Sequence, residues 1–120
     1  MIHKVPQGSS GNKIELAVAN TSNHVTRHVR VEVQSPPSWI QFERPVVTID
    51  EIPAGNEGVA VFTFSVGQTV PAGTEHTLQF VIRSEQNEKW TKEIQIAIVE
   101  QTIFVMLLTK LRQWAGEEAK

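Results

Sequence analysis

The sequence predicts an all-β fold in which two antiparallel sheets pack face to face around one core. In five segments, apolar residues recur at every second position, so each segment offers one apolar and one mostly polar face. Clusters of Gly, Pro, Asn and Ser separate these segments at short intervals, as turns do between the strands of a sandwich. The chain has 120 residues, 40% of them hydrophobic, which is sufficient for one domain with its own core.

In chain order, the alternating segments are residues 14–18, 29–33, 62–66, 78–82 and 94–98, and shorter strands are predicted at 39–42 and 46–49. Such alternation is typical of antiparallel sheets with one face buried and the other in water. The side chains expected on the two inner faces are Ile14, Leu16, Val18, Val29, Val31, Val33, Phe62, Phe64, Val66, Leu78, Phe80, Ile82, Ile94, Ile96 and Ile98. About seven strands is the number expected for an immunoglobulin-like antiparallel β-sandwich.

The segments between the strands contain residues that favour reversals of the chain. Gly and Asn tolerate positive φ, and Pro fixes φ near the value that many turns require. The turn segments are 20–23, 35–38, 53–56, 67–73 and 84–87. Asn20-Thr21-Ser22 also fits the acceptor pattern for N-glycosylation, but a turn is by itself a sufficient reason for an Asn at this position.

The alternating pattern divides the chain into three parts. Residues 1–11 contain one Lys and no apolar run, so we interpret them as a linker or tail and not as a signal peptide. Residues 12–100 are expected to form the sandwich, and residues 101–120 a C-terminal amphipathic segment, either a helix or an added strand. The apolar run at 103–108 is far shorter than the roughly 20 residues that a membrane-spanning helix needs.

The C-terminal segment is a candidate contact surface. If it is helical, one stripe holds Phe104, Leu107, Leu108, Leu111 and Trp114. Three interpretations stay open. The stripe docks on a partner, which includes self-association with a second copy, or it packs on an edge of the domain's own sheet, or it belongs to a following domain.

Composition excludes several classes of function. The chain has no Cys, which excludes disulfides, thiolate nucleophiles, zinc–thiolate sites and iron–sulfur clusters. The formal net charge is −2, so there is no basic excess that would bind the phosphates of a nucleic acid. We therefore expect no nucleic-acid partner.

The titratable residues do not form a pattern that indicates catalysis or metal binding. His24 and His28 are four apart, but one lies in a predicted turn and the other at the start of a strand, so their spacing does not bring them together. Asp50 is followed by no ligand-rich loop of the kind that binds calcium. Neither a nucleophile elbow nor a phosphate-binding loop is present. The carboxylates expected at outward strand positions are Glu15, Glu32, Glu43 and Glu93. We predict no enzyme activity, no cofactor and no metal.

Two tryptophans fall within the predicted sandwich. Trp39 follows Pro37-Ser38 at the entrance of a strand and is a candidate sugar contact, because planar aromatic side chains stack on sugar rings. The alternative, which we favour, is that Trp39 closes one end of the sandwich. Trp90 continues the inward register of residues 94–98, so we expect it in the core.

The order of these features resembles one family of domains. Asn20-Thr21 precedes the Val-rich strand 29–33, Pro36-Pro37-Ser38-Trp39 follows, and Ile52-Pro53-Ala54-Gly55 leads into 61–66. Val70-Pro71-Ala72-Gly73-Thr74 then leads into Leu78-Gln79-Phe80. Over about residues 12–99 the chain resembles the bacterial immunoglobulin-like NPCBM-associated domains of alpha-galactosidases and the related cell-adhesion-type domains. It departs from the pattern at Asn20-Thr21-Ser22 and Ser38, where Gly is common, and at His76, where Tyr is usual.

The resemblance implies an accessory sandwich without activity of its own, in a secreted, cell-surface or periplasmic multidomain protein. Composition alone leaves a cytoplasmic location open. We therefore expect a non-catalytic structural or interaction module, a spacer or protein-contact domain of a larger bacterial protein. Its partners would be neighbouring domains or another protein. The alternative is an accessory carbohydrate-binding module attached to a glycoside hydrolase, which would use Trp39.

Overall fold

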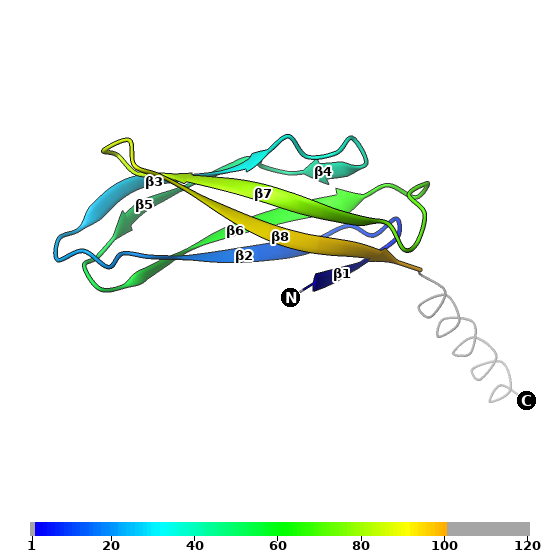
Figure 1. Ribbon diagram of the computed structural model, residues 1–120, viewed down its shortest axis with the longest axis horizontal. Coiled ribbons are helices and arrows are strands. Elements are labelled where there is room, and N and C mark those ends of the chain that lie inside the picture. The colour runs from blue at the N-terminus through cyan, green and yellow to red at the C-terminus, as the bar shows by residue number, and fades with distance from the viewer. Residues whose placement is uncertain (1, 101–120) are drawn as a thin grey trace, which may run out of the picture.

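The computed structural model describes residues 2–100, and all regular structure in this range is β-strand (Figure 1). The strands are β1 (Ile2–Pro6), β2 (Asn12–Ala19), β3 (Thr26–Gln34), β4 (Ile40–Phe42), β5 (Val46–Ile52), β6 (Glu57–Val66), β7 (Glu75–Arg83) and β8 (Lys89–Val99). No helix in this range is long and apolar enough to span a membrane. The candidate contact stripe Phe104, Leu107, Leu108, Leu111 and Trp114 lies outside the described residues, as does the rest of segment 101–120.

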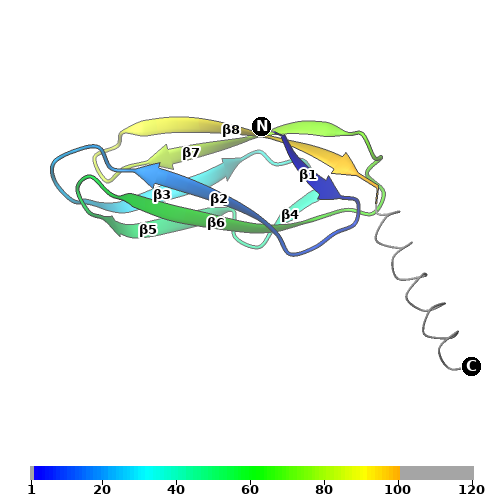
Figure 2. The same ribbon diagram turned by 90° about the horizontal axis from the view of Figure 1, so that it is seen from below.

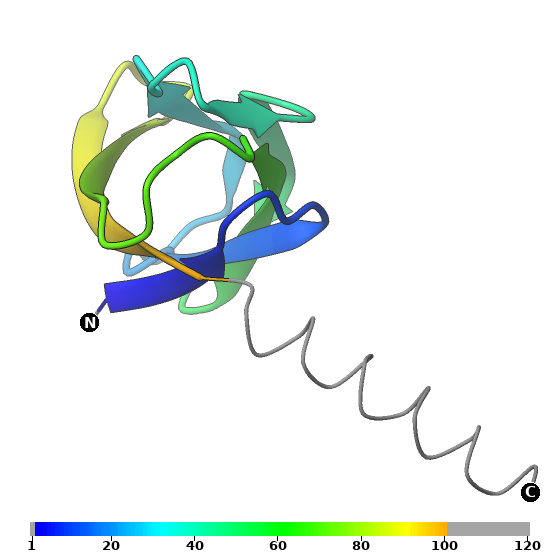
Figure 3. The ribbon, with the colours of Figure 1, turned by 90° about the vertical axis from the view of Figure 1, so that its right-hand side faces the viewer.

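The strands form two sheets that face each other. The larger sheet has the order β1-β8-β7-β3-β5, and the smaller has the order β2-β6-β4. All neighbours pair antiparallel except β1, which runs parallel to β8. Viewed along the long axis of the sandwich, the two layers enclose the interior (Figure 3). The predicted immunoglobulin-like β-sandwich is confirmed.

The predicted inner faces form the core. All fifteen expected side chains are buried except Val18, which is half-buried and packs against the others. The sheets meet at Phe62 of β6 and Phe80 of β7, both 0% exposed, whose ring centroids are 5.0 Å apart. The alternation in the sequence therefore reports burial correctly, because side chains two apart share one face of a strand.

The N-terminal segment differs from the expectation. Residues 1–11 were interpreted as a linker or tail, but Ile2–Pro6 is a strand at the edge of the larger sheet (Figure 2). Val5 is 4% exposed, and the carbonyl oxygen of Val99 accepts the N–H of Gln7 at 2.8 Å. This strand is the eighth, beyond the seven predicted. It has only one buried side chain, so its sequence contains no visible alternation.

Asn20 joins the two sheets at one end of the sandwich. It follows β2 of the smaller sheet and is 8% exposed. Its Nδ2 donates to the carbonyl oxygens of His24 and Ile52, both at 2.9 Å. Its Oδ1 accepts hydrogen bonds from the N–H of Ser22 at 3.1 Å and from the Ser22 hydroxyl at 2.7 Å. Because Ile52 ends β5 of the larger sheet, the Asn expected in a turn also links turn to sheet.

Candidate binding groove beside strand β8

The outer edge of β8 is only partly covered by its neighbour. β1 pairs with the C-terminal part of β8, from Gln95 to Val99. Among residues 2–100, no strand pairs with the outer side of residues 89–94. This part of the larger sheet therefore ends in an open strand edge.

The hydrogen bonds at the two ends of the β7–β8 hairpin show which backbone groups face outward. The N–H of Ile98 donates to the carbonyl of Thr74, and the N–H of Ser84 donates to the carbonyl of Glu88. In an antiparallel pair the residues bonded to the partner alternate along the strand. Even-numbered residues of β8 therefore bond to β7. The odd-numbered Lys89, Thr91 and Glu93 point their N–H and C=O groups to the outer edge.

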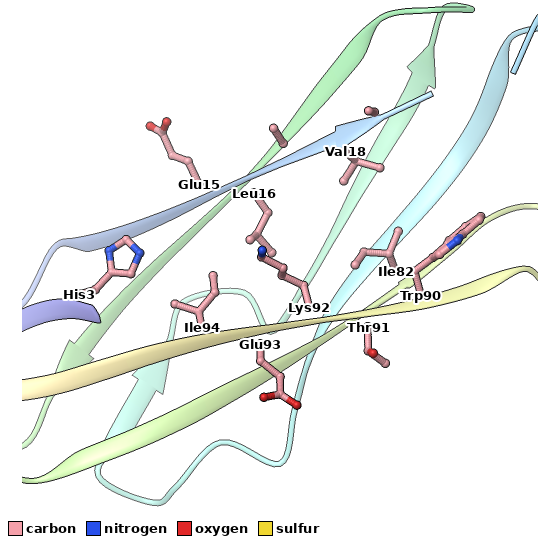
Figure 4. A pocket seen from close by; sticks show the side chains of 12 residues that line it. His3, Glu15, Leu16, Val18, Ile82, Trp90, Thr91, Lys92, Glu93 and Ile94 are labelled. Carbon is pink, nitrogen blue, oxygen red and sulfur yellow. The ribbon is translucent and has the colours of Figure 1, made fainter. Parts of the chain in front are cut away.

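A groove of about 630 Å³ runs beside this edge, between β8 of the larger sheet and β2 of the smaller sheet (Figure 4). Its apolar lining comes from Leu16 and Val18 of β2, Ile82 of β7, and Trp90 and Ile94 of β8. A second hollow of about 450 Å³ shares Val18 and Ile82 with it and extends to the turn at Asn20. The seam between the sheets is thus open on this side.

Trp90 is the residue that most clearly differs from the sequence prediction. We expected it in the core, but it is 51% exposed and lines the groove. The inward register was right, because Trp90 has the same parity as the buried Ile94, Ile96 and Ile98. In the part of the chain that the structure describes, no strand covers Trp90, since β1 pairs with residues 95–99 of β8.

The polar side chains around the groove do not form a reactive set. His3, Glu15, Lys92 and Glu93 line it and are all exposed. Among residues 2–100, no three His, Asp or Glu side chains come close enough to hold a metal ion. The groove offers an apolar floor beside unpaired backbone donors and acceptors, which is the surface that an extended polypeptide binds when it adds a strand to a sheet.

The other candidate residues lie apart from the groove. Trp39 is half-buried and packs against the core, with its ring edge-on to His76 at a centroid distance of 5.9 Å. His24 lies in the turn after β2, and His28 lies in β3, where its Nδ1 is 3.5 Å from the carboxylate of Glu85. Of the carboxylates expected at outward positions, Glu15, Glu43 and Glu93 are exposed. Glu32 is half-buried.

Sequence reasoning missed the groove, although one signal for it was present. Lys92 interrupts the apolar series that includes Ile94, Ile96 and Ile98 on the inward face of β8. A charged side chain at an inward position indicates that the strand extends beyond the covered core. Whether β1 covers that part depends on the relative lengths of two strands, which side-chain alternation does not report.

Comparison with known proteins agrees with this architecture. A family model described as "NPCBM-associated, NEW3 domain of alpha-galactosidase" matches residues 7–85. The match confirms the resemblance drawn from the sequence. No curated protein matches the chain in a sequence search.

Solved structures of similar fold include two chaperones. The YadV chaperone matches with a TM-score of 0.53 and 10% identity, over 82% of this chain and 48% of the chaperone chain. The periplasmic chaperone SfaE matches with a TM-score of 0.51 and 10% identity, over 83% of this chain and 55% of the other. This chain therefore spans about half the length of these proteins. At such low identity, the similarity concerns the fold alone.

Proposed function

The chain belongs to the NPCBM-associated family, the NEW3 domain of alpha-galactosidase, and from this membership we propose that it is a non-catalytic protein-contact domain of a larger bacterial protein. Its contact surface is the outer edge of β8 at residues 89–94, together with the groove beside it. An extended polypeptide segment binds there as an added strand. The parent protein acts outside the cytoplasm, at the cell surface, in the periplasm or after secretion.

The observation that carries this proposal is the combination of an open strand edge with an apolar floor. Unpaired N–H and C=O groups on an edge strand form a template for another strand. Leu16 and Ile94, 7% and 8% exposed, form a mostly buried floor, and Trp90, 51% exposed, offers the apolar surface that an added strand would cover. β1 provides an internal example, because it pairs with the same edge further along and buries Val5 in the core.

A selection of displayed random peptides tests the proposal. Peptides are selected on the full chain and counter-selected on Thr91→Pro. Since the N–H of Thr91 points outward, Pro removes a hydrogen bond to an added strand without removing one to β7. We expect the enriched peptides to be extended, with alternating apolar residues, and to shift the NMR signals of Leu16 and Thr91. Failure to obtain peptides that distinguish the two proteins contradicts the proposal.

Two further measurements separate the rival functions. The first is migration in an affinity gel that contains a polysaccharide. If the polysaccharide retards the chain, and a folded Trp39→Ala variant is not retarded, the carbohydrate-binding alternative is favoured over a protein-contact domain. Hydrolysis of a glycoside, ester or peptide that follows the pure protein would contradict a non-catalytic role. We expect no retardation, because the indole of Trp39 is half-buried against the core and does not offer a free face to a sugar ring. We expect no hydrolysis, because the polar side chains around the groove do not form a reactive set.

A further inference from the structure

We propose that the outer edge of β8 pairs with the same edge of a second copy of this chain, which gives a symmetric dimer joined by antiparallel strands. The inference rests on the proposed function, since it names the partner of the same edge. A twofold axis brings identical patches together, so the edge has to be complementary to itself. The backbone register, the outward-facing charges and the inward-facing side chains of residues 89–94 all meet this requirement.

The backbone allows one favourable register. Odd-numbered residues carry the outward N–H and C=O groups, so in an antiparallel pair they must face odd-numbered residues of the copy. The free stretch begins with β8 at Lys89 and ends before Gln95, where β1 begins to pair. The register that makes the most hydrogen-bonded pairs of odd-numbered residues within this stretch places Thr91 opposite Thr91 on the twofold axis. Lys89 of each copy then lies opposite Glu93 of the other.

The charges on the outward face fit this register. Lys89, Thr91 and Glu93 are exposed, and their side chains point away from the core. Opposite charges directly across an antiparallel pair are favourable, as is a Thr–Thr pair, and like charges are unfavourable. The register forms one Lys–Glu pair on each side of the axis. A shift by two residues that places Lys89 opposite Thr91 loses both Lys89–Glu93 pairs.

Within one copy, Lys89 is in an unfavourable place. Its neighbour across the hairpin is Arg83 of β7, so two positive charges lie side by side at the end of the sheet. A carboxylate on the open side of Lys89 offsets this repulsion. The second copy supplies that carboxylate through Glu93.

The inward face fits as well. In the same register Trp90 lies opposite Lys92 of the copy, which brings an ammonium group to a half-exposed indole ring. Both side chains line the groove that the added strand would cover. The dimer therefore covers Trp90 and extends each larger sheet into a continuous sheet that runs through both copies.

Sedimentation velocity of the full chain, from about 10 μM to about 1 mM, tests the proposal. The concentration range is high because an interface made by one short strand from each copy is small and gives a weak dimer. We expect the sedimentation coefficient to rise with concentration. Lys89→Glu and Glu93→Lys each place like charges opposite one another, so each variant alone should dimerise about tenfold more weakly or worse. An equimolar mixture of the two should dimerise again, because each Glu then faces a Lys.

The mixture is the decisive control. Both substitutions are on exposed side chains, so circular dichroism should match that of the unsubstituted chain, and Lys89→Glu should be no less stable to heat because its carboxylate then faces Arg83. A chain that stays monomeric over the whole range overturns the dimer. Association that both single variants leave unchanged also overturns it, since the contact then lies elsewhere. The peptide selection described above does not depend on self-association, so it still tests the proposed function if the dimer fails.

Discussion

Replacing Asn20 by Ala should destabilise the sandwich more than its place in a surface turn suggests. The substitution removes hydrogen bonds to the carbonyls of Ile52 and His24 and from the backbone and hydroxyl of Ser22. The His24 carbonyl keeps a partner, because the Ser22 hydroxyl lies 2.9 Å from it and donates to it once the Asn20 Oδ1 is gone. The carbonyl of Ile52 loses the Asn20 amide that donates to it.

The hydrogen bond from Asn20 Nδ2 to the carbonyl of Ile52 is buried, and it is the largest single loss expected on substitution. A buried carbonyl without a partner costs about 1–3 kcal/mol, and each further lost hydrogen bond about 0.5–1.5 kcal/mol. We expect a loss of about 2–4 kcal/mol in the free energy of unfolding.

Urea unfolding followed by far-ultraviolet circular dichroism measures this loss, and the midpoint should fall by on the order of 1–2 M. The matched control is Asn23→Ala, in the same turn, where the exposed Asn side chain has one hydrogen bond within residues 2–100, to the ring of its neighbour His24. That variant should stay within about 0.5 kcal/mol of the unsubstituted chain. If Asn20→Ala is no less stable than Asn23→Ala, the turn is not joined to β5 as described.

Three further predictions concern other parts of the sandwich. Gly58→Ala should destabilise by about 1–3 kcal/mol in urea unfolding, because a Cβ at Gly58 would lie 3.0 Å from Cγ1 of Ile52; an unchanged midpoint would contradict the close approach of β5 and β6. His28 has a φ of 53° within β3, so His28→Gly should leave stability unchanged or raise it by up to about 1 kcal/mol; a loss above about 1 kcal/mol contradicts this strain. Trp90→Ala should cost less than about 1 kcal/mol, whereas Ile96→Ala, at the same parity but 0% exposed, should cost about 2–5 kcal/mol; equal losses would mean that Trp90 is covered after all.

The core could be predicted from the sequence because its determinant is local. Side chains two apart share one face of a strand, so alternation at residues such as Phe62 and Phe64 reports directly which face is buried. The correct outward placement of Glu15 and Glu93 follows from the same rule. Each of these positions depends on its own strand and needs no knowledge of the neighbours.

The features that were missed depend on relations between strands. β1 buries only Val5, so no alternation distinguishes it from a tail. The exposure of Trp90 follows from where β1 begins to pair with β8, which neither strand encodes alone. The bond from Asn20 to Ile52 spans 32 residues and exists only once the sheets have packed. The groove was missed for the same reason, since both sheets contribute to it.

Amide hydrogen exchange along β8, measured by NMR on dilute protein, tests whether residues 89–94 form an open strand edge. In an open edge, the N–H groups of Thr91 and Glu93 lie in solvent, and those of Lys92 and Ile94 are bonded to β7. We predict fast exchange at Thr91 and Glu93 and slow exchange at Lys92 and Ile94. Equal protection at all four amides in dilute protein would contradict the open edge, and with it the contact surface proposed for this domain.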